Sequence, residues 1–326
     1  MSAPWIEDLR LNPLPALLSW RDPALNYFTR RDLLEEQAGP VEKLWGLPSA
    51  RKIINRQQAD GSWRYPGKGY NPKTGTNYTL LETYRQLRLL VEMYGLQREH
   101  ACIQIAADYV FTCQAEEGDI RGILGNQHMP YYHGAILELI VKAGYANDPR
   151  LEKGLEWLLS VRQADGGWVV PTQAVPSKQR NSQYWLGKPI KADSQKASSH
   201  LATGMALRAF TAHSRYHQNP EVIAAANFLK GRLFRADAYT DRKAPSYWLK
   251  FQYPFWWTNL LTALDSLSRL GYSPPDEQLK RGIDWFLTNQ SEDGLWETGY
   301  GSGGRAGENR HWVGLAICRV LKRLII

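Results

Sequence analysis

Cysteine is scarce in this chain of 326 residues, and long apolar runs are missing altogether. The three cysteines, Cys102, Cys113 and Cys318, are odd in number and lack the spacing of metal ligands. They predict buried free thiols and exclude both a disulfide framework and a cysteine-based zinc site. No apolar stretch reaches about 18 residues, and the N-terminus lacks the basic end and apolar run of a secretion signal. We therefore expect a cytoplasmic protein without a membrane-spanning helix, for which peripheral contact with a membrane stays open.

Glycine-rich nucleotide-binding motifs are also absent. The segment Gly299-Tyr-Gly301-Ser-Gly-Gly304 follows no strand pattern and opens no helix in the right register. The net charge is nevertheless +8. A binder of single-stranded nucleic acid interleaves aromatic and basic residues along an open groove, whereas the aromatic residues here cluster where repeats join. We therefore expect neither a nucleic-acid partner nor a cofactor.

A short motif recurs four times, each time after a helical stretch. It consists of a glutamine, acidic residues, a glycine and, in three copies, a tryptophan. Recurrence at this scale predicts one two-helix unit that is copied along the chain. The acidic-glycine pair forms a tight turn, and the tryptophan offers a large face for packing. The copies are Gln58-Ala-Asp-Gly-Ser-Trp63, Gln114-Ala-Glu-Glu-Gly118, Gln163-Ala-Asp-Gly-Gly-Trp168 and Gln290-Ser-Glu-Asp-Gly-Leu-Trp296.

The motifs divide the chain into helix pairs. Apolar residues at helical spacing precede each motif, and a second helical pattern follows it. A degenerate copy at residues 224–234 keeps the helix and loses the turn, which gives five pairs, and an extra helix is expected over residues 25–36. No linker divides the chain, and its 13 tryptophans indicate a large core. We predict one all-α domain, residues 1–326. It is an (α/α) toroid of about five helix pairs with an N-terminal helical extension, residues 1–48.

At these motifs the chain resembles the toroidal superfamily of terpenoid cyclases and protein prenyltransferases. It is also similar to prokaryotic prenyltransferase or squalene oxidase repeat proteins in the segments Tyr27-Phe-Thr-Arg-Arg-Asp-Leu-Leu34 and Leu233-Phe-Arg235. The resemblance covers most of the chain. It implies inner and outer rings of helices, but no particular activity, because one fold hosts many functions.

The catalytic motifs that the resemblance implies are missing. A proton-initiated cyclase would carry Asp-x-Asp-Asp, whereas Asp193 stands alone, and the aspartate-rich magnesium motif of a diphosphate-ionising synthase is absent too. Zinc prenyltransferases use an aspartate, a cysteine and a histidine. His311 matches that histidine by position, but the stretch before Pro254 reads Lys250-Phe-Gln-Tyr253. We therefore expect no bound metal.

Candidate site residues stand at the starts of the predicted inner helices, which in a toroid converge on one mouth. Histidines there can act as acids, bases or ligands, or can simply cap helices and pack against aromatic rings. Carboxylates farther along the inner faces are candidate acids, or else they pair with neighbouring cations. The candidate catalytic residues are His133, His200, His311, Glu138 and Asp265, and the candidate substrate-binding aromatics are Tyr131, Tyr132, Trp256, Trp257 and Trp312.

The loop of residues 172–196 is long and basic. It holds five basic residues against the single acid Asp193, and it precedes the inner helix that starts near His200. Lys188 and Lys191 are therefore candidate ligand contacts. Together with the positive ends of the inner helices, they favour an anionic small molecule over a neutral hydrocarbon. General solubility is the other explanation of the basic charge.

Three functions fit these observations. The preferred one is a terpenoid-cyclase-like or prenyltransferase-like protein, without the standard cyclase aspartates, that binds an anionic, partly hydrophobic, isoprenoid-like molecule in a central aromatic cavity. The second is a carbohydrate-active α/α-barrel hydrolase or lyase, in which aromatic rings stack on sugars. The third is a non-catalytic binding module. Whether the chain is an enzyme stays open at this stage.

Overall fold

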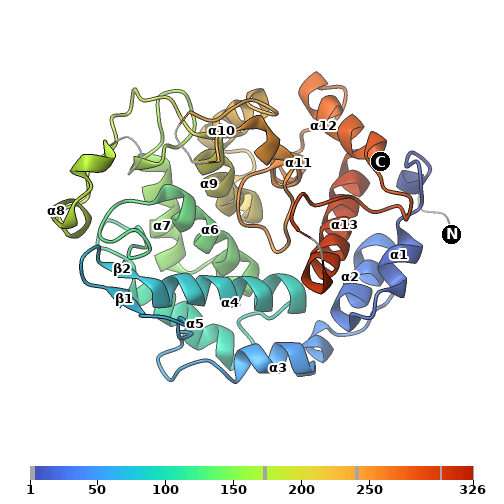
Figure 1. Cartoon of the computed structure of the whole chain (residues 1–326), viewed down its shortest axis with the longest axis horizontal. Coiled ribbons are helices and arrows are strands. Elements are labelled where there is room, and N and C mark those ends of the chain that lie inside the picture. The colour runs from blue at the N-terminus through green and yellow to red at the C-terminus, as the bar shows by residue number, and fades with distance from the viewer. Residues whose placement is uncertain (1–3, 172–174, 239–241, 302, 326) are drawn as a thin grey trace.

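The computed structural model describes residues 4–171, 175–238, 242–301 and 303–325, and these residues are mostly helical (Figure 1). Within them, five helix pairs follow one another, each an outer helix and then an inner one. The outer helices are α3 (Pro48–Ile54), α5 (Ala101–Thr112), α7 (Pro149–Ser160), α10 (Pro220–Gly231) and α12 (Glu277–Thr288). The inner helices are α4 (Tyr78–Tyr94), α6 (Pro130–Ile140), α9 (His200–Ala212), α11 (Leu260–Arg269) and α13 (Gly304–Ile325).

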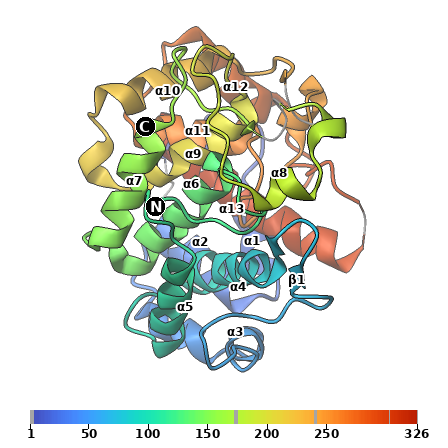
Figure 2. The ribbon, with the colours of Figure 1, turned by 90° about the vertical axis from the view of Figure 1, so that its left-hand side faces the viewer.

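The inner helices form a closed ring. Each packs on the next in the order α4, α6, α9, α11 and α13, and the N-terminal helix α2 (Pro23–Leu33) contacts both α13 and α4. The shorter helix α1 (Leu14–Ser19) lies against α2 and α13. Figures 1 and 2 show this arrangement from two directions. The predicted all-α toroid of five pairs with an extra N-terminal helix is confirmed, and that helix completes the ring.

Other elements are short. In the described residues the only strands are β1 (Tyr70–Asn71) and β2 (Thr76–Asn77), which pair antiparallel, and α8 (Ser182–Leu186) interrupts the loop before α9. Single helical turns of other types occur at Pro4–Ile6, Val41–Gly46, Val141–Tyr145, Ser177–Gln179, Ser214–Tyr216 and Pro245–Leu249. No helix in the described part of the chain is long and apolar enough to cross a bilayer.

The motif tryptophans anchor each turn to its own outer helix. The indole Nε1 of Trp63 donates to the Ile53 carbonyl at 2.8 Å, and that of Trp168 donates to the Leu158 carbonyl at 2.8 Å. Trp296 repeats the contact, and all three rings are buried. Each acceptor carbonyl is ten residues earlier, near the end of the outer helix. The tryptophans therefore have a structural role, as their packing geometry requires.

The motif glutamines join consecutive repeats. The Gln114 amide donates to the Gly118 carbonyl in its own turn and to the Arg150 carbonyl at the start of α7. The Gln290 amide donates to the Leu11 carbonyl at 2.9 Å and thereby links the last repeat to the N-terminal segment. These side-chain hydrogen bonds connect neighbouring repeats and close the outer ring.

In the first repeat the joining residue is Gln57, not Gln58 as the motif suggested. The Gln57 amide donates to the carbonyls of Gly61 and Cys102, at 3.0 and 2.8 Å. The exposed Gln58 side chain donates to the Ser62 hydroxyl of its own turn. The physical reason is register, because Gln57 lies six residues before its partner across the turn, Trp63, as Gln114 does before Ile120 and Gln290 before Trp296.

The two adjacent glutamines allow a matched test of this assignment. Gln57→Ala removes two hydrogen bonds to partly buried carbonyls, so we expect a loss of about 1–3 kcal/mol in the free energy of unfolding. Gln58→Ala should change it by less than about 0.5 kcal/mol, as is usual at exposed positions. Urea denaturation of both variants measures the difference. Equal losses would show that the repeats are not joined through Gln57.

Candidate functional site

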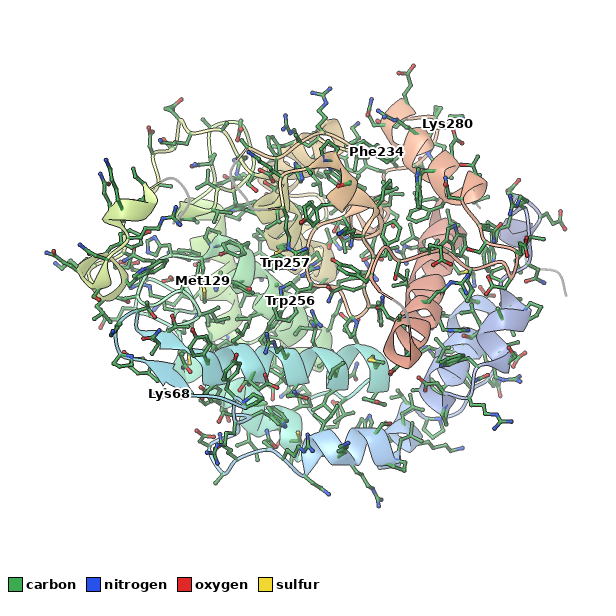
Figure 3. All side chains as sticks on the ribbon, viewed as in Figure 1. Lys68, Met129, Phe234, Trp256, Trp257 and Lys280 are labelled. Atoms are coloured by element: carbon green, nitrogen blue, oxygen red, sulfur yellow. The ribbon has the colours of Figure 1, made fainter. Side chains whose placement is uncertain are left out.

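Aromatic rings fill the ring of helices at the N-terminal ends of the inner helices. Tyr132 lies 6.2 Å, centroid to centroid, from both Trp256 and Trp257, and Tyr84 lies 5.1 Å from Trp256. The Arg88 guanidinium covers the Trp256 ring at 4.3 Å. Figure 3 shows both tryptophans near the middle of the molecule. Of the candidate aromatics, Tyr132, Trp256 and Trp257 thus pack against one another.

Little space remains beside His200 and Trp257. The cavity that His200 and Trp257 line with Trp248 and Tyr300 has a volume of about 10 Å³, which holds about one water molecule. Tyr131 is buried too. His200 and Trp257 therefore share only a small space at this end of the ring. Aromatic side chains from α4, from α6 and from the segment before α11 pack together here.

His133 is a structural residue. Its Nδ1 accepts a hydrogen bond from the Ile120 amide at 3.0 Å, and its Nε2 lies 2.9 Å from the Gly154 carbonyl on α7. The ring is completely buried, and its burial lowers the pKa of His133 to about 4. Both nitrogens are engaged by backbone groups, so the neutral ring has no free position for a substrate. The His133 ring thus links the inner helix α6 to the outer helix α7.

This burial predicts a pH effect on stability. The folded pKa of His133, about 4, is below the ordinary value of 6.5, so its contribution is complete above pH 6.5 and is lost as pH falls toward 4. Between about pH 7 and pH 5 this amounts to roughly 2 kcal/mol. His133→Gln keeps a hydrogen-bond acceptor and a donor but no group that titrates in this range. In urea denaturation, its free energy of unfolding should therefore fall by roughly 2 kcal/mol less than that of the parent between about pH 7 and pH 5. An unchanged pH dependence would contradict the buried neutral ring.

The other two histidines lie apart from His133. His200 packs on the Trp248 ring at 4.6 Å, with Nδ1 3.5 Å from the Asp237 carboxylate, and burial lowers its pKa to about 4. His311 lies about two turns inside α13 rather than at its start, and stacks on Trp20 at 4.0 Å. The three rings thus have different neighbours. They do not come together as a three-nitrogen group, since each ring contacts a different partner.

Three candidate ligand contacts are also dispersed. Trp312 is buried and donates to the Asp22 carboxylate at 3.0 Å, so it fixes α13 to the N-terminal helices. Lys188 is exposed, and Lys191 lines a separate cavity of about 540 Å³ beside Trp157. None of these side chains lines the small cavity beside His200. Residues 172–174 of the basic loop lie outside the described residues.

Glu138 and Asp265 are held in ion pairs. Glu138 lies 2.9 Å from Nε of Arg208 and 2.7 Å from Nζ of Lys142, and Asp265 lies 3.0 Å from Nε of Arg269. Although burial alone would raise it, neighbouring cations, above all Arg269, hold the pKa of Asp265 below its usual range. The alternative of pairing with cations is therefore what the structure shows. An ionised carboxylate of this kind is a poor proton donor.

A much larger cavity, of about 630 Å³, opens at the opposite end of the ring. The C-terminal parts of inner helices line it, together with the end of α2. Phe28, Val91 and Tyr253 supply apolar surface, and the remaining lining is mostly charged. The charged residues are Arg31, Asp32, Glu92, Lys142, Arg269, Arg319, Lys322 and Arg323. Sequence reasoning missed this cavity, although Arg31 and Asp32 belong to the segment, residues 27–34, that carries the resemblance.

An ion-pair network surrounds this cavity. Nζ of Lys142 lies 2.6 Å from the Glu92 carboxylate and also pairs with Glu138. The Tyr253 hydroxyl donates to Glu92 at 3.1 Å. Arg319 pairs with Asp32 at 2.5 Å. Burial would raise the pKa of Glu92, but Lys142 holds it below its usual range, and Arg319 does the same for Asp32. The carboxylates are therefore ionised, and the cations have fixed positions.

The network carries more positive than negative charge. Its seven cations are the six in the lining and Arg208, and its five carboxylates are Asp32, Glu35, Glu92, Glu138 and Asp265. Two positive charges are thus in excess. The C-terminal end of a helix carries partial negative charge, so the helix ends around the cavity stabilise nearby cations. The buried Arg208 does not itself line the cavity, and its three guanidinium nitrogens have no hydrogen-bond partner among the described residues. The geometry suits an anion.

One group of residues in the described part of the chain has the spacing of metal ligands. Ligand atoms of Glu117, Asp119 and His128 lie within 4.8 Å of one another. The Arg121 guanidinium pairs with both carboxylates and lies 3.2 Å from the His128 ring. This arginine already supplies the positive charge that such a group needs.

No protein-family model matches the chain, and no curated protein matches its sequence. Solved structures match it in overall arrangement. A protein from Actinoplanes is 17% identical, with a TM-score of 0.43 over 87% of this chain and 86% of that one. Type II terpene cyclase MstE from Scytonema, in complex with geranylgeranyl dihydroxybenzoate, is 13% identical, with a TM-score of 0.46 over 98% of each chain. A novel alpha-amylase from Clostridium perfringens is 11% identical, with a TM-score of 0.44 over 92% and 85%.

Proposed function

We propose that this protein binds an anionic, partly hydrophobic small molecule, of isoprenoid diphosphate type, in the cavity at the C-terminal ends of the inner helices. The observation that carries the proposal is the cavity's lining. Six cations and a short apolar surface of Phe28, Val91 and Tyr253 meet in one space of about 630 Å³. A concave site with an apolar wall and a few polar groups is the usual form of a small-molecule site.

The cations favour a group with two or more negative charges. Arginine and lysine hold phosphate oxygens through charge-assisted hydrogen bonds, and the network has two positive charges in excess. Arg31 also lies 4.7 Å from the Phe28 ring, which brings a cation and an apolar face together. A diphosphate joined to a hydrocarbon chain satisfies both parts of the lining.

The same lining argues against proton-initiated chemistry. The pKa values of Asp32, Glu92 and Asp265 are all lowered, so these carboxylates stay ionised and have no proton to donate near neutral pH. Burial, with Glu92 nearby, raises the pKa of Tyr253, so that hydroxyl holds its proton. The residues are therefore suited to binding and to stabilising a released anion. The proposal favours a binding protein, or an enzyme that acts on the anionic group.

Calorimetric titration with three probes tests this function. Farnesyl diphosphate should bind more tightly than inorganic pyrophosphate, which lacks the hydrocarbon, and than farnesol, which lacks the charge. Added salt should weaken the binding of both charged probes. Failure of farnesyl diphosphate to bind would contradict the proposal. Binding of a neutral oligosaccharide in its place would favour the carbohydrate-active alternative.

A further inference from the structure

Apolar side chains are exposed on the flank that carries α8 and the β1–β2 hairpin. Five large hydrophobic residues are exposed among the described residues, and three of them, Tyr70, Leu186 and Ile190, belong to this flank. Leu186 is 47% exposed and Ile190 49%. Figure 1 shows α8 projecting from the ring above the hairpin. Clustered exposure of this kind marks an interaction surface more often than a scatter of single residues does.

The flank is a fixed surface. A methyl group built on Gly75 would lie 2.8 Å from Cδ2 of Leu186 and 3.7 Å from the Tyr70 hydroxyl, so the hairpin and α8 are in contact. The Gln127 side chain accepts from the Ile190 amide at 3.1 Å, and the Gln127 amide donates to the Tyr184 carbonyl. Neighbouring loops therefore hold the exposed side chains in place.

Cations surround these apolar side chains. Lys68, Lys73 and Lys188 are exposed, and none of them forms an ion pair with a described residue. The chain contains no aspartate or glutamate over residues 64–81 or 166–192, which include the hairpin and α8. The flank thus joins an exposed apolar strip to uncompensated positive charge.

We propose that this flank, defined by Lys68, Tyr70, Lys73, Leu186, Lys188 and Ile190, docks on an anionic lipid surface. Apolar side chains enter the interface between head groups and acyl chains, while lysines attract anionic head groups. Exposed apolar side chains flanked by lysines are the combination that an anionic bilayer engages, and we commit to that occupant. The exposed Leu186 and Ile190 decide against a nucleic acid, which would engage the lysines alone. Docking would bring an amphiphilic ligand and its source together, although this proposal does not depend on the ligand.

Vesicle sedimentation with the full chain tests the apolar part. The parent should sediment with vesicles of phosphatidylcholine and phosphatidylserine, and much less with phosphatidylcholine alone. Leu186→Ser combined with Ile190→Ser should weaken partitioning into the mixed vesicles by about tenfold or more. Leu11→Ser, at an exposed leucine on the N-terminal segment, is the control and should partition like the parent.

Three lysine substitutions test the charge. Lys68→Gln, Lys73→Gln and Lys188→Gln together should weaken vesicle binding by roughly a hundredfold. The control is Lys43→Gln, Lys52→Gln and Lys280→Gln, which changes the net charge equally. Lys68 and Lys280 lie on opposite sides of the molecule in Figure 3. If both triple variants lost binding equally, net charge rather than this flank would be responsible, and the proposal would be overturned.

Two further outcomes would also overturn it. One is a parent that fails to sediment with the mixed vesicles. The other is tight binding of a single-stranded RNA that the flank lysine variant loses and the Leu186→Ser, Ile190→Ser variant keeps, because that result assigns the flank to nucleic acid.

Discussion

Glu138→Leu is expected to destabilise the protein by about 3–5 kcal/mol, because it leaves Arg208 buried without its carboxylate partner. The Arg208 side chain is 2% exposed and that of Glu138 is 5% exposed. Lys142 keeps its second partner, Glu92, at 2.6 Å, so the loss falls mainly on Arg208. Urea denaturation measures the effect directly.

A double variant tests whether Glu138 stabilises the protein through its ion pair with Arg208. Glu138→Leu with Arg208→Leu removes both charges, and apolar replacement of a buried pair is often nearly neutral, so most of the lost stability should return. Asp284→Leu, which breaks the exposed pair with Lys280, should barely shift the denaturation midpoint. If the single and double variants were equally unstable, Glu138 would contribute by something other than pairing with Arg208.

Removing two cations from the large cavity should weaken ligand binding by about a hundredfold or more. Arg31→Gln with Lys322→Gln deletes two charged donors, each worth about 1.5–3 kcal/mol when bonded to a charged group. Both residues line the cavity on the side that the N-terminal helix α2 forms. Calorimetric titration with farnesyl diphosphate gives the dissociation constant for parent and variant.

Lys188→Gln with Lys191→Gln is the matched control for this experiment. It removes the same net charge from the basic loop that sequence reasoning placed over the ligand. These two lysines lie away from the large cavity, so farnesyl diphosphate should bind this variant as it binds the parent. The reverse pattern, with binding lost only in the loop variant, would return the site to the other end of the ring.

The sequence predicted the fold well because its signals are local. Each turn motif is anchored by contacts within about ten residues, such as the Trp168 indole bonded to the Leu158 carbonyl. The role of the N-terminal helices was beyond local reasoning. Their closure of the ring depends on pairs such as Trp312 with Asp22 and Gln290 with Leu11, which are separated by 290 and 279 residues.

The site was harder to predict because the direction of each side chain matters. His133 and His200 are on successive inner helices, yet His133 lies three residues into α6 and His200 is the first residue of α9, so their rings meet different partners. Tyr132, Trp256 and Trp257 lie together whereas Trp312 lies elsewhere, and spacing cannot show whether rings line a cavity or fill it. The useful signal was the set of cations on inner helices, above all Arg208 and Arg269, which pair with the candidate carboxylates Glu138 and Asp265.

A crystal structure of the protein with farnesyl diphosphate tests the central claim most directly. The account predicts the diphosphate in the cavity at the C-terminal ends of the inner helices, within hydrogen-bond distance of Arg31 or Lys322, with its hydrocarbon against Phe28 and Tyr253. A diphosphate found instead beside His200 and Trp257, at the aromatic end of the ring, would contradict it.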